Sequence, residues 1–239
     1  MVFEGSSQHG WILPSARCRT ASLATLRTTL LDIHPPEEQD PPDQFTWGTR
    51  GNRSPLFSIK ATWEFVRDSA PLVSWEKAVW FKYAVPKHAF HFWVTNLDRL
   101  PLRERLEKWG ICVQDTCCLC GLAQETRDHV FLHCGVASQL WDMIMLRLGQ
   151  RGLTFVDWSS LIDWMISDTA GLSPVLKKLT VQNVIYSLWK ERNCRLHNAG
   201  SDTTIGLFRK IDRSLRDVLL ACLPHKRCQD LIAQWFEFG

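Results

Sequence analysis

The chain has 239 residues, of which 45% are hydrophobic and 22% are charged, a composition that excludes a disordered protein and allows a sizeable core. The formal net charge of +3 is too small to indicate nucleic-acid binding by itself, so local charge must carry any such argument. No run approaches 18 apolar residues and no signal-peptide pattern opens the chain, so we expect an intracellular protein outside the membrane.

Residues 1–57 predict an irregular arm. Within it, the pattern of residues 23–33 indicates a short amphipathic helix, and residues 34–43, with four prolines, indicate a linker. Residues 45–58 hold two short aromatic runs around glycine and proline, which allows a small β-hairpin there.

Residues 58–150 follow the helical period and predict a helical domain. Ile59, Trp63 and Val66, for example, fall on one helical face at spacings of four and three. Ser74 is a credible N-cap for the next helix, which Pro86 is expected to stop. Further helices are expected at residues 87–97, 102–110 and 136–149.

Residues 151–239 predict a C-terminal helical region. Asp157 can cap a helix over residues 158–167. Ser173 and Pro174 begin a long helix that closes near residue 200, because proline suits the first helical position. A second long helix is expected from residue 204 to the proline at 224. The fold class predicted is therefore mainly α: a small helical domain with a possible hairpin before it and a pair of long helices after it.

Residues 117–134 hold four cysteines and two histidines, the strongest chemical signal in the chain. Cys117 and Cys120 are separated by two residues, and Gly121 permits the tight turn that would aim both sulfurs at one point. Clustered thiols in a reducing compartment favour metal binding over disulfides. The window therefore predicts a zinc knuckle with one tetrahedral Zn²⁺ ion.

The second pair of ligands has two solutions. His129 can be joined by Cys134 or by His133, and spacing alone does not separate them. A catalytic zinc would need an open coordination position and a nearby general base. Glu125 and Asp128 are close in sequence, but such acids commonly cap helices or stay solvated. We therefore expect a structural ion.

Several motifs of this region occur together in one known family. They are the tryptophans at 75 and 80 before Pro86-Lys87, the segment from Arg99 to Leu106, and the C-x2-C with Glu125-Thr126 and H-x4-C. With residues 57–67 and 74–111 around them, they resemble the zinc-binding reverse-transcriptase-associated domain. That domain lies at the C-terminal end of plant non-LTR (LINE-class) retrotransposon polyproteins.

The resemblance implies a structural zinc bound by Cys117, Cys120, His129 and Cys134, and so favours Cys134 over His133. It implies a module beside a reverse transcriptase rather than an enzyme. A polymerase of that class needs paired aspartates for two metal ions, and no Asp-Asp dipeptide occurs in the chain. A zinc-dependent nuclease is a weaker hypothesis, because the chain shows no recognisable set of catalytic carboxylates.

The resemblance also implies contact with RNA or single-stranded DNA. Residues 82–108 hold six Lys and Arg against three Asp and Glu, and residues 177–227 hold eleven against four. Such clusters bind phosphates with release of counterions. The candidate phosphate contacts are Lys87, Arg99, Arg103, Arg105, Lys190, Arg192 and Arg195.

A second function stays open from the sequence. The same domain could be a structural or protein-interaction module that packs on a polymerase and binds no nucleic acid itself. Neither function involves a membrane or a small-molecule substrate. Nuclear residence would suit a retroelement's DNA target, although the chain shows no clear basic import run.

Overall fold

The computed structural model describes residues 6–7, 10–12, 20–35, 44–49, 51–68, 70–71, 73–111, 114–221 and 226–238. Its contacts divide the chain into two compact units, Met1–Pro71 and Leu72–Gly239. The three-part organisation suggested by the sequence, with residues 1–57, 58–150 and 151–239 as separate parts, stays a prediction.

The first unit contains short elements only. Strands β1 (Ser6–Ser7) and β2 (Gly10–Trp11) form one antiparallel pair, and helix α1 spans Ala21–Leu31. Strands β3 (Trp47–Thr49) and β4 (Asn52–Ser54) form a second antiparallel pair, which is the hairpin expected from the sequence. Helix α2 (Ile59–Val66) begins after Ser58, whose hydroxyl accepts the Ala61 N–H at 3.2 Å.

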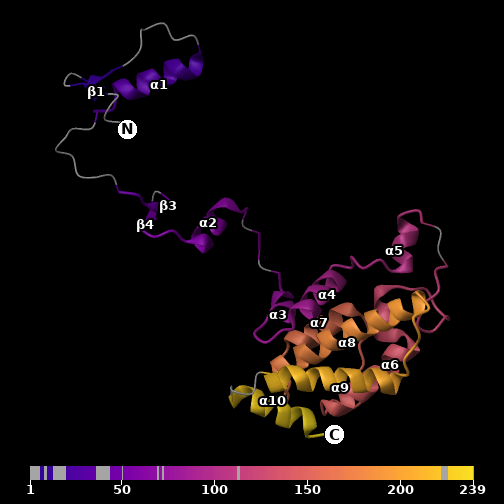
Figure 1. Ribbon diagram of the computed structural model, residues 1–239. Helices are drawn as coiled ribbons and strands as arrows, with labels where there is room; N and C mark the ends of the chain where they lie inside the picture. The colour runs from indigo at the N-terminus through magenta and orange to yellow at the C-terminus, as the bar shows by residue number, and fades with distance from the viewer. Residues whose placement is uncertain are drawn as a thin grey trace. The chain divides into compact units, whose positions relative to one another are not determined.

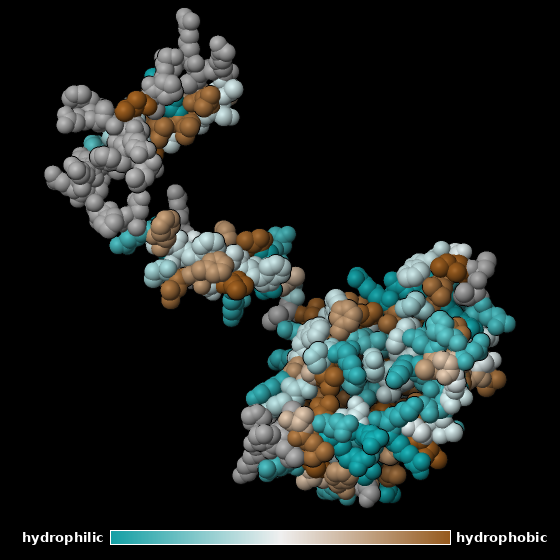
Figure 2. Space-filling view, in the orientation of Figure 1, coloured by the Kyte–Doolittle hydropathy of each residue, from teal (hydrophilic) through white to brown (hydrophobic). Residues whose placement is uncertain are grey.

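Neither helix of the first unit contains a buried residue. Ile59, Trp63, Phe65 and Val66 of α2 are 64–76% exposed. Figure 2 shows hydrophobic side chains on the surface of the α1 and α2 segments. Helical stability in proteins comes mainly from packing an apolar face. In α2 these apolar side chains are exposed instead.

The second unit is built from helices (Figure 1), so the mainly α fold expected from the sequence is confirmed. Among the residues that the structure describes, none of its helices has the length and apolar character needed to cross a bilayer. The helices are α3 (Glu76–Val79), α4 (Pro86–Asn96), α5 (Arg103–Lys108), the π-helical turn η2 (His129–His133), α6 (Gly135–Arg147), α7 (Trp158–Ile166), α8 (Pro174–Leu196), α9 (Thr204–Ala221) and α10 (Lys226–Phe236).

Helix α8 is the centre of this unit. It packs against α4, α7 and α9, and Figure 1 shows it running between α4 and α9. Six of its apolar side chains are almost fully removed from water, which stabilises the unit by about 1.5–3 kcal/mol for each large side chain buried. The buried apolar residues of α8 are Leu176, Leu179, Val181, Val184, Ile185 and Leu188.

Two helix boundaries differ from the sequence-based expectation. The helix expected from Ser74 is the single turn α3, because Trp80 is extended and Tyr83 has a left-handed φ of 75°. Pro86 does not stop a helix but is the first residue of α4, where its missing N–H costs nothing. Helix α10, whose Leu231 and Trp235 are buried, was not predicted from the sequence.

Candidate metal centre

Residues 115–125, called the knuckle below, form a tight loop that carries Cys117 and Cys120, with Cys118 between them. Thr116 and Gln124 pair as an isolated antiparallel bridge, and the Cys117 N–H donates to the Ala123 carbonyl at 2.7 Å. The Gly121 N–H donates to the Cys117 carbonyl at 2.8 Å, and Gly121 has a φ of +70°. Only glycine takes that backbone conformation without strain, so Gly121 lets the chain turn directly after Cys120.

His129 is the first residue of η2 and Cys134 directly follows its last residue. The Cys134 N–H donates to the His129 carbonyl at 2.6 Å, a bond that spans five residues and widens the helical turn. Thr126 Oγ1 accepts the His129 N–H at 3.1 Å and fixes the start of the turn. As a result, His129 and Cys134 lie on the same side, facing the knuckle.

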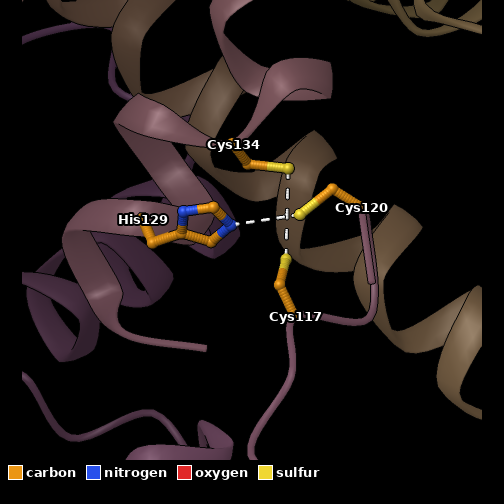
Figure 3. Close-up of side chains that lie close together, drawn as sticks. All are labelled: Cys117, Cys120, His129 and Cys134. Atoms are coloured by element: carbon orange, nitrogen blue, oxygen red, sulfur yellow. Dashed lines mark hydrogen bonds between the residues drawn. The ribbon is translucent and has the colours of Figure 1, made fainter. Parts of the chain in front are cut away.

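Figure 3 shows Cys117, Cys120, His129 and Cys134 pointing toward one centre. Their ligand atoms all lie within 4.8 Å of one another. The Cys117 and Cys134 sulfurs are 4.0 Å apart, and Cys120 Sγ lies 3.3 Å from His129 Nε2. Tetrahedral zinc with usual bond lengths of about 2.3 Å to sulfur and about 2.0 Å to nitrogen requires separations of roughly 3.5–3.8 Å. The residues present therefore fit one zinc ion.

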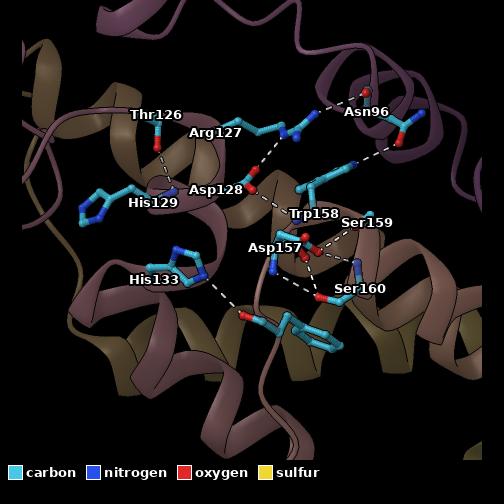
Figure 4. A network of polar contacts seen from close by, with 11 residues as sticks. Asn96, Thr126, Arg127, Asp128, His129, His133, Asp157, Trp158, Ser159 and Ser160 are labelled. Carbon is cyan, nitrogen blue, oxygen red and sulfur yellow. Dashed lines mark hydrogen bonds and ion pairs between the residues drawn. The ribbon is translucent and has the colours of Figure 1, made fainter.

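His133 lies outside this cluster. Its Nε2 is 3.3 Å from the carbonyl oxygen of Phe155 (Figure 4), and its side chain is exposed. The alternative that the sequence left open, in which His133 completes the set, would require that contact to break. The geometry favours Cys134, as the family pattern implied.

The pKa values of two neighbouring sulfurs, Cys117 and Cys134, are shifted in opposite directions. The Cys117 hydrogen bond lowers the pKa of Cys134, with help from the N–H groups of Val136 and Ala137 at the start of α6. The same hydrogen bond and burial raise the pKa of Cys117. A zinc ion deprotonates its thiol ligands outright, so binding replaces this shared proton by two metal–sulfur bonds.

Glu125, at the end of the knuckle, connects three parts of the unit. It is 0% exposed, and its carboxylate accepts the N–H groups of Arg103 at 3.1 Å and Cys118 at 3.0 Å. It also pairs with Arg192 of α8 at 2.5 Å. Burial acts to raise the pKa of Glu125, but the Arg192 and Cys118 hydrogen bonds outweigh it and hold the pKa below its usual value. Glu125 is thus a structural anchor, and it is not one of the four residues whose ligand atoms lie together.

Arg195 makes a second connection between the knuckle and α8. Its Nη1 donates to the Leu119 carbonyl at 2.6 Å, between the two knuckle cysteines. Its Nε bonds to Glu191 at 2.7 Å, and its Nη2 donates to the Asp202 carbonyl at 3.1 Å. One side chain therefore ties the knuckle to α8 and to the loop before α9.

The η2 side of the site is held by a separate polar network (Figure 4). Asp128 bonds to Arg127 at 2.9 Å and accepts the Trp158 N–H, at the start of α7, at 3.2 Å. The Trp158 ring nitrogen donates to Asn96 Oδ1, at the end of α4, at 2.9 Å. Asp157 caps α7 with a reciprocal bond from Ser160, as the sequence predicted.

The structure divides the seven candidate phosphate contacts into two groups. Four are engaged internally: Arg192 and Arg195 as described, Arg103 through the Thr116 carbonyl at 2.6 Å, and Arg105 through the Asp98 carbonyl and the Trp109 ring. The other three are exposed and form no ion pair with the residues that the structure describes: Lys87, Arg99 and Lys190.

Sequence reasoning did not identify the buried Glu125–Arg192 pair. The two residues are 67 positions apart, so no local spacing signals their contact. The contacts of His88 and His91 with Tyr186, whose ring centre lies 4.6 Å from the first ring and 5.6 Å from the second, are likewise not signalled by local spacing.

Comparison with known proteins identifies the segment that carries this site. Residues 57–141 match the family model described as zinc-binding in reverse transcriptase, and the match includes all four residues of the cluster. That segment is therefore a zinc-binding, reverse-transcriptase-associated domain, and family and geometry together support one structural zinc. A search of curated proteins and a search of solved structures gave no match to the chain.

Proposed function

We propose that the second unit, with its zinc-binding domain of reverse-transcriptase type, is a non-catalytic module that binds single-stranded RNA or DNA beside a reverse transcriptase. In this proposal Cys117, Cys120, His129 and Cys134 supply all four zinc ligands. A closed set of four protein ligands leaves no position for substrate or water, as in structural zinc sites. The ion would then stabilise the knuckle, and nucleic acid would bind elsewhere on the unit.

The observation that carries this proposal is the pairing of free cations with aromatic rings on α4 and α8. Lys87 Nζ lies 5.4 Å from the ring centre of Tyr186, and Lys190 is one helical turn further along α8. The ring centres of Phe90 and Trp80 lie 5.7 and 6.4 Å from that of Trp93, and the two residues are 57% and 48% exposed. Single-strand binding proteins combine these two features, because cations hold the backbone and rings stack on bases.

The arginines with internal partners are consistent with separate residues for supporting the knuckle and for contacting phosphate. Arg103, Arg192 and Arg195 hold the knuckle in place, so the proposal assigns phosphate contacts to Lys87, Arg99 and Lys190 among the predicted residues. We also propose a retroelement origin and an intracellular, reducing location, where the thiol ligands stay reduced. Fractionation of cells that express a tagged chain would test the location.

A salt titration tests the nucleic-acid proposal. A labelled single strand of RNA or DNA about 12 nucleotides long, within the usual site sizes of such modules, is titrated with zinc-loaded protein. The logarithm of affinity should fall with the logarithm of salt concentration, with a slope of about −0.7 for each phosphate contact. Binding should also fall when a chelator removes zinc. Absence of binding at low salt, with zinc bound, would contradict the proposal.

The second candidate function is a protein-interaction module, and α2 favours it. Its four large apolar side chains lie in a helix with no buried residue. A separately purified reverse transcriptase domain should then bind the chain through α2, and Trp63→Glu should weaken that binding. A charge on an apolar contact face is costly to desolvate, whereas Glu64→Gln in the same helix serves as a matched control.

A further inference from the structure

Two hollows of the second unit meet along one face of α8. Tyr186, Lys190 and Cys194 line both of them, and these residues are spaced four apart, so they form a single ridge on the helix. One hollow lies between α4, α8 and α9 and has a volume of about 140 Å³. The other lies along the C-terminal half of α8 and has a volume of about 400 Å³.

The smaller hollow, called the lysine hollow, is lined by three lysines and two acids. Both acids already have cationic partners: Glu191 pairs with Arg195, and Asp202 pairs with Lys210. Lys87 and Lys190 are exposed and have no such partner among the described residues. The lysine hollow therefore presents two uncompensated positive charges, which attract an anion.

The larger hollow, called the ring hollow, is lined by His91, Tyr186, Trp189 and His197. The His91 ring lies 5.6 Å from Tyr186 and 5.7 Å from Trp189, so three rings form a continuous wall. Neither ring nitrogen of His91 has a hydrogen-bond partner among the described residues. Rings with offset or edge contacts at such distances offer π-faces on which a planar heterocycle stacks.

We propose that the two hollows form one nucleotide subsite, in which a base stacks in the ring hollow and its phosphate binds Lys87 and Lys190. The ridge from Tyr186 to Cys194 places the anion-binding hollow directly beside the stacking hollow, as one nucleotide requires. This inference rests on the proposed function and deepens it. The subsite predicts that the affinity for a single strand depends on one stacked base, and not only on positive charge distributed over the unit.

The test uses the whole zinc-loaded chain and two matched pairs of variants. Trp189→Leu removes a ring of the subsite, and Trp109→Leu removes an exposed ring that lines neither hollow. Lys190→Gln removes a cation of the subsite, and Lys82→Gln removes an exposed cation outside it. Each protein is titrated with intact RNA, intact single-stranded DNA and an abasic strand of equal length. Zinc content and circular dichroism confirm folding.

The subsite predicts a specific set of results. Trp189→Leu should weaken binding of intact strands about 10-fold, within the range of base–aromatic stacking, and leave abasic binding unchanged. Lys190→Gln should make the salt slope shallower by about 0.7, the change expected for one lost phosphate contact, while Lys82→Gln should not.

Two other outcomes overturn the inference in different ways. If wild-type protein binds strands but each subsite variant behaves like its control, the subsite is wrong and the proposed function stands. If zinc-loaded wild-type protein binds no strand at any salt, the proposed function fails and the subsite with it. Should Trp189→Leu not fold, the exposed Lys190→Gln and its control still decide the question.

Discussion

Glu125 of the knuckle and Arg192 of α8 form a buried pair in which one carboxylate oxygen accepts two guanidinium N–H groups, at 2.5 and 3.2 Å. Their side chains are 0% and 3% exposed. The pair joins the metal centre to the central helix of the unit. Such a pair does not by itself add much stability, but loss of one partner leaves a buried, uncompensated charge.

We therefore expect Glu125→Ala to lower the free energy of unfolding by about 3–5 kcal/mol. Urea unfolding at fixed free zinc would measure it. The control is Glu104→Gln, which removes a solvent-exposed ion pair with Lys108 and should change stability far less, because water and salt screen such pairs. Replacing both Glu125 and Arg192 by apolar residues should recover part of the loss. A loss below about 1 kcal/mol for Glu125→Ala would contradict the role assigned to the pair.

Arg195 supports the knuckle from outside the ligand set. Removing its hydrogen bond to the Leu119 carbonyl should loosen the loop between Cys117 and Cys120. Arg195→Ala should lower zinc affinity about 10-fold, the low end of the effect of groups that orient metal ligands. Competition with a chromophoric chelator would measure it. Arg99→Ala, an exposed arginine, is the control, and equal affinities for the two variants would count against the supporting role.

His88 and His91 predict a pH dependence of stability. Burial, more than the nearby charges of Lys87 and His88, lowers the pKa of each from 6.5 to about 4. Because the folded pKa is the lower one, the unfolded chain binds more protons between pH 4 and 6.5. The stability from these neutral histidines is complete above pH 6.5 and is lost as the pH falls toward 4. The loss could reach about 3 kcal/mol for each histidine.

The comparison that isolates this effect is wild type against His91→Phe. Both proteins keep the same zinc ligands, so acid release of zinc affects them equally. The variant should lose less stability between pH 6.5 and 4, by up to about 1.4 kcal/mol per pH unit for one proton. Phenylalanine suits the site, because neither ring nitrogen of His91 has a hydrogen-bond partner among the residues that the structure describes. Parallel pH profiles would show that His91 does not titrate as described.

Removal of zinc should have a local effect first. Among the described residues, the knuckle contributes only Cys117 and Leu119 to the hydrophobic core, whereas α8 contributes six side chains between residues 176 and 188. With a chelator present, hydrogen exchange should therefore lose protection over residues 115–125 before residues 176–188. Simultaneous loss over both segments would mean that zinc holds the entire unit together, and unchanged exchange would mean that it holds nothing.

The sequence predicts those parts of the molecule that local spacing determines. The C-x2-C turn before Gly121, the Asp157 cap and the long helix from Pro174 depend on residues within a few positions of one another. The prediction of one helix over residues 74–83 was wrong, because Tyr83 has a left-handed backbone conformation and α4 begins at Pro86. The internal hydrogen bonds of Arg192 and Arg195 could not be predicted either. The sequence does not show whether an arginine contacts a phosphate or a group that lies far away along the chain.

The choice between Cys134 and His133 shows the same limit at the metal centre. Both follow His129 at usable spacings, and only the wider turn of η2 directs Cys134 inward while His133 faces the Phe155 carbonyl. Val130 and Phe131 within that turn are 0% exposed, and their packing against the rest of the unit is not visible in the spacing of the ligands.

The most direct test of the account is the zinc content of purified, reduced protein and of two neighbouring variants. Elemental analysis should find one zinc per chain in the wild type and in His133→Ala, and a loss of zinc in Cys134→Ala. A wild-type chain that folds equally well with no stoichiometric zinc, or a His133→Ala variant that alone loses the ion, would contradict the site described here.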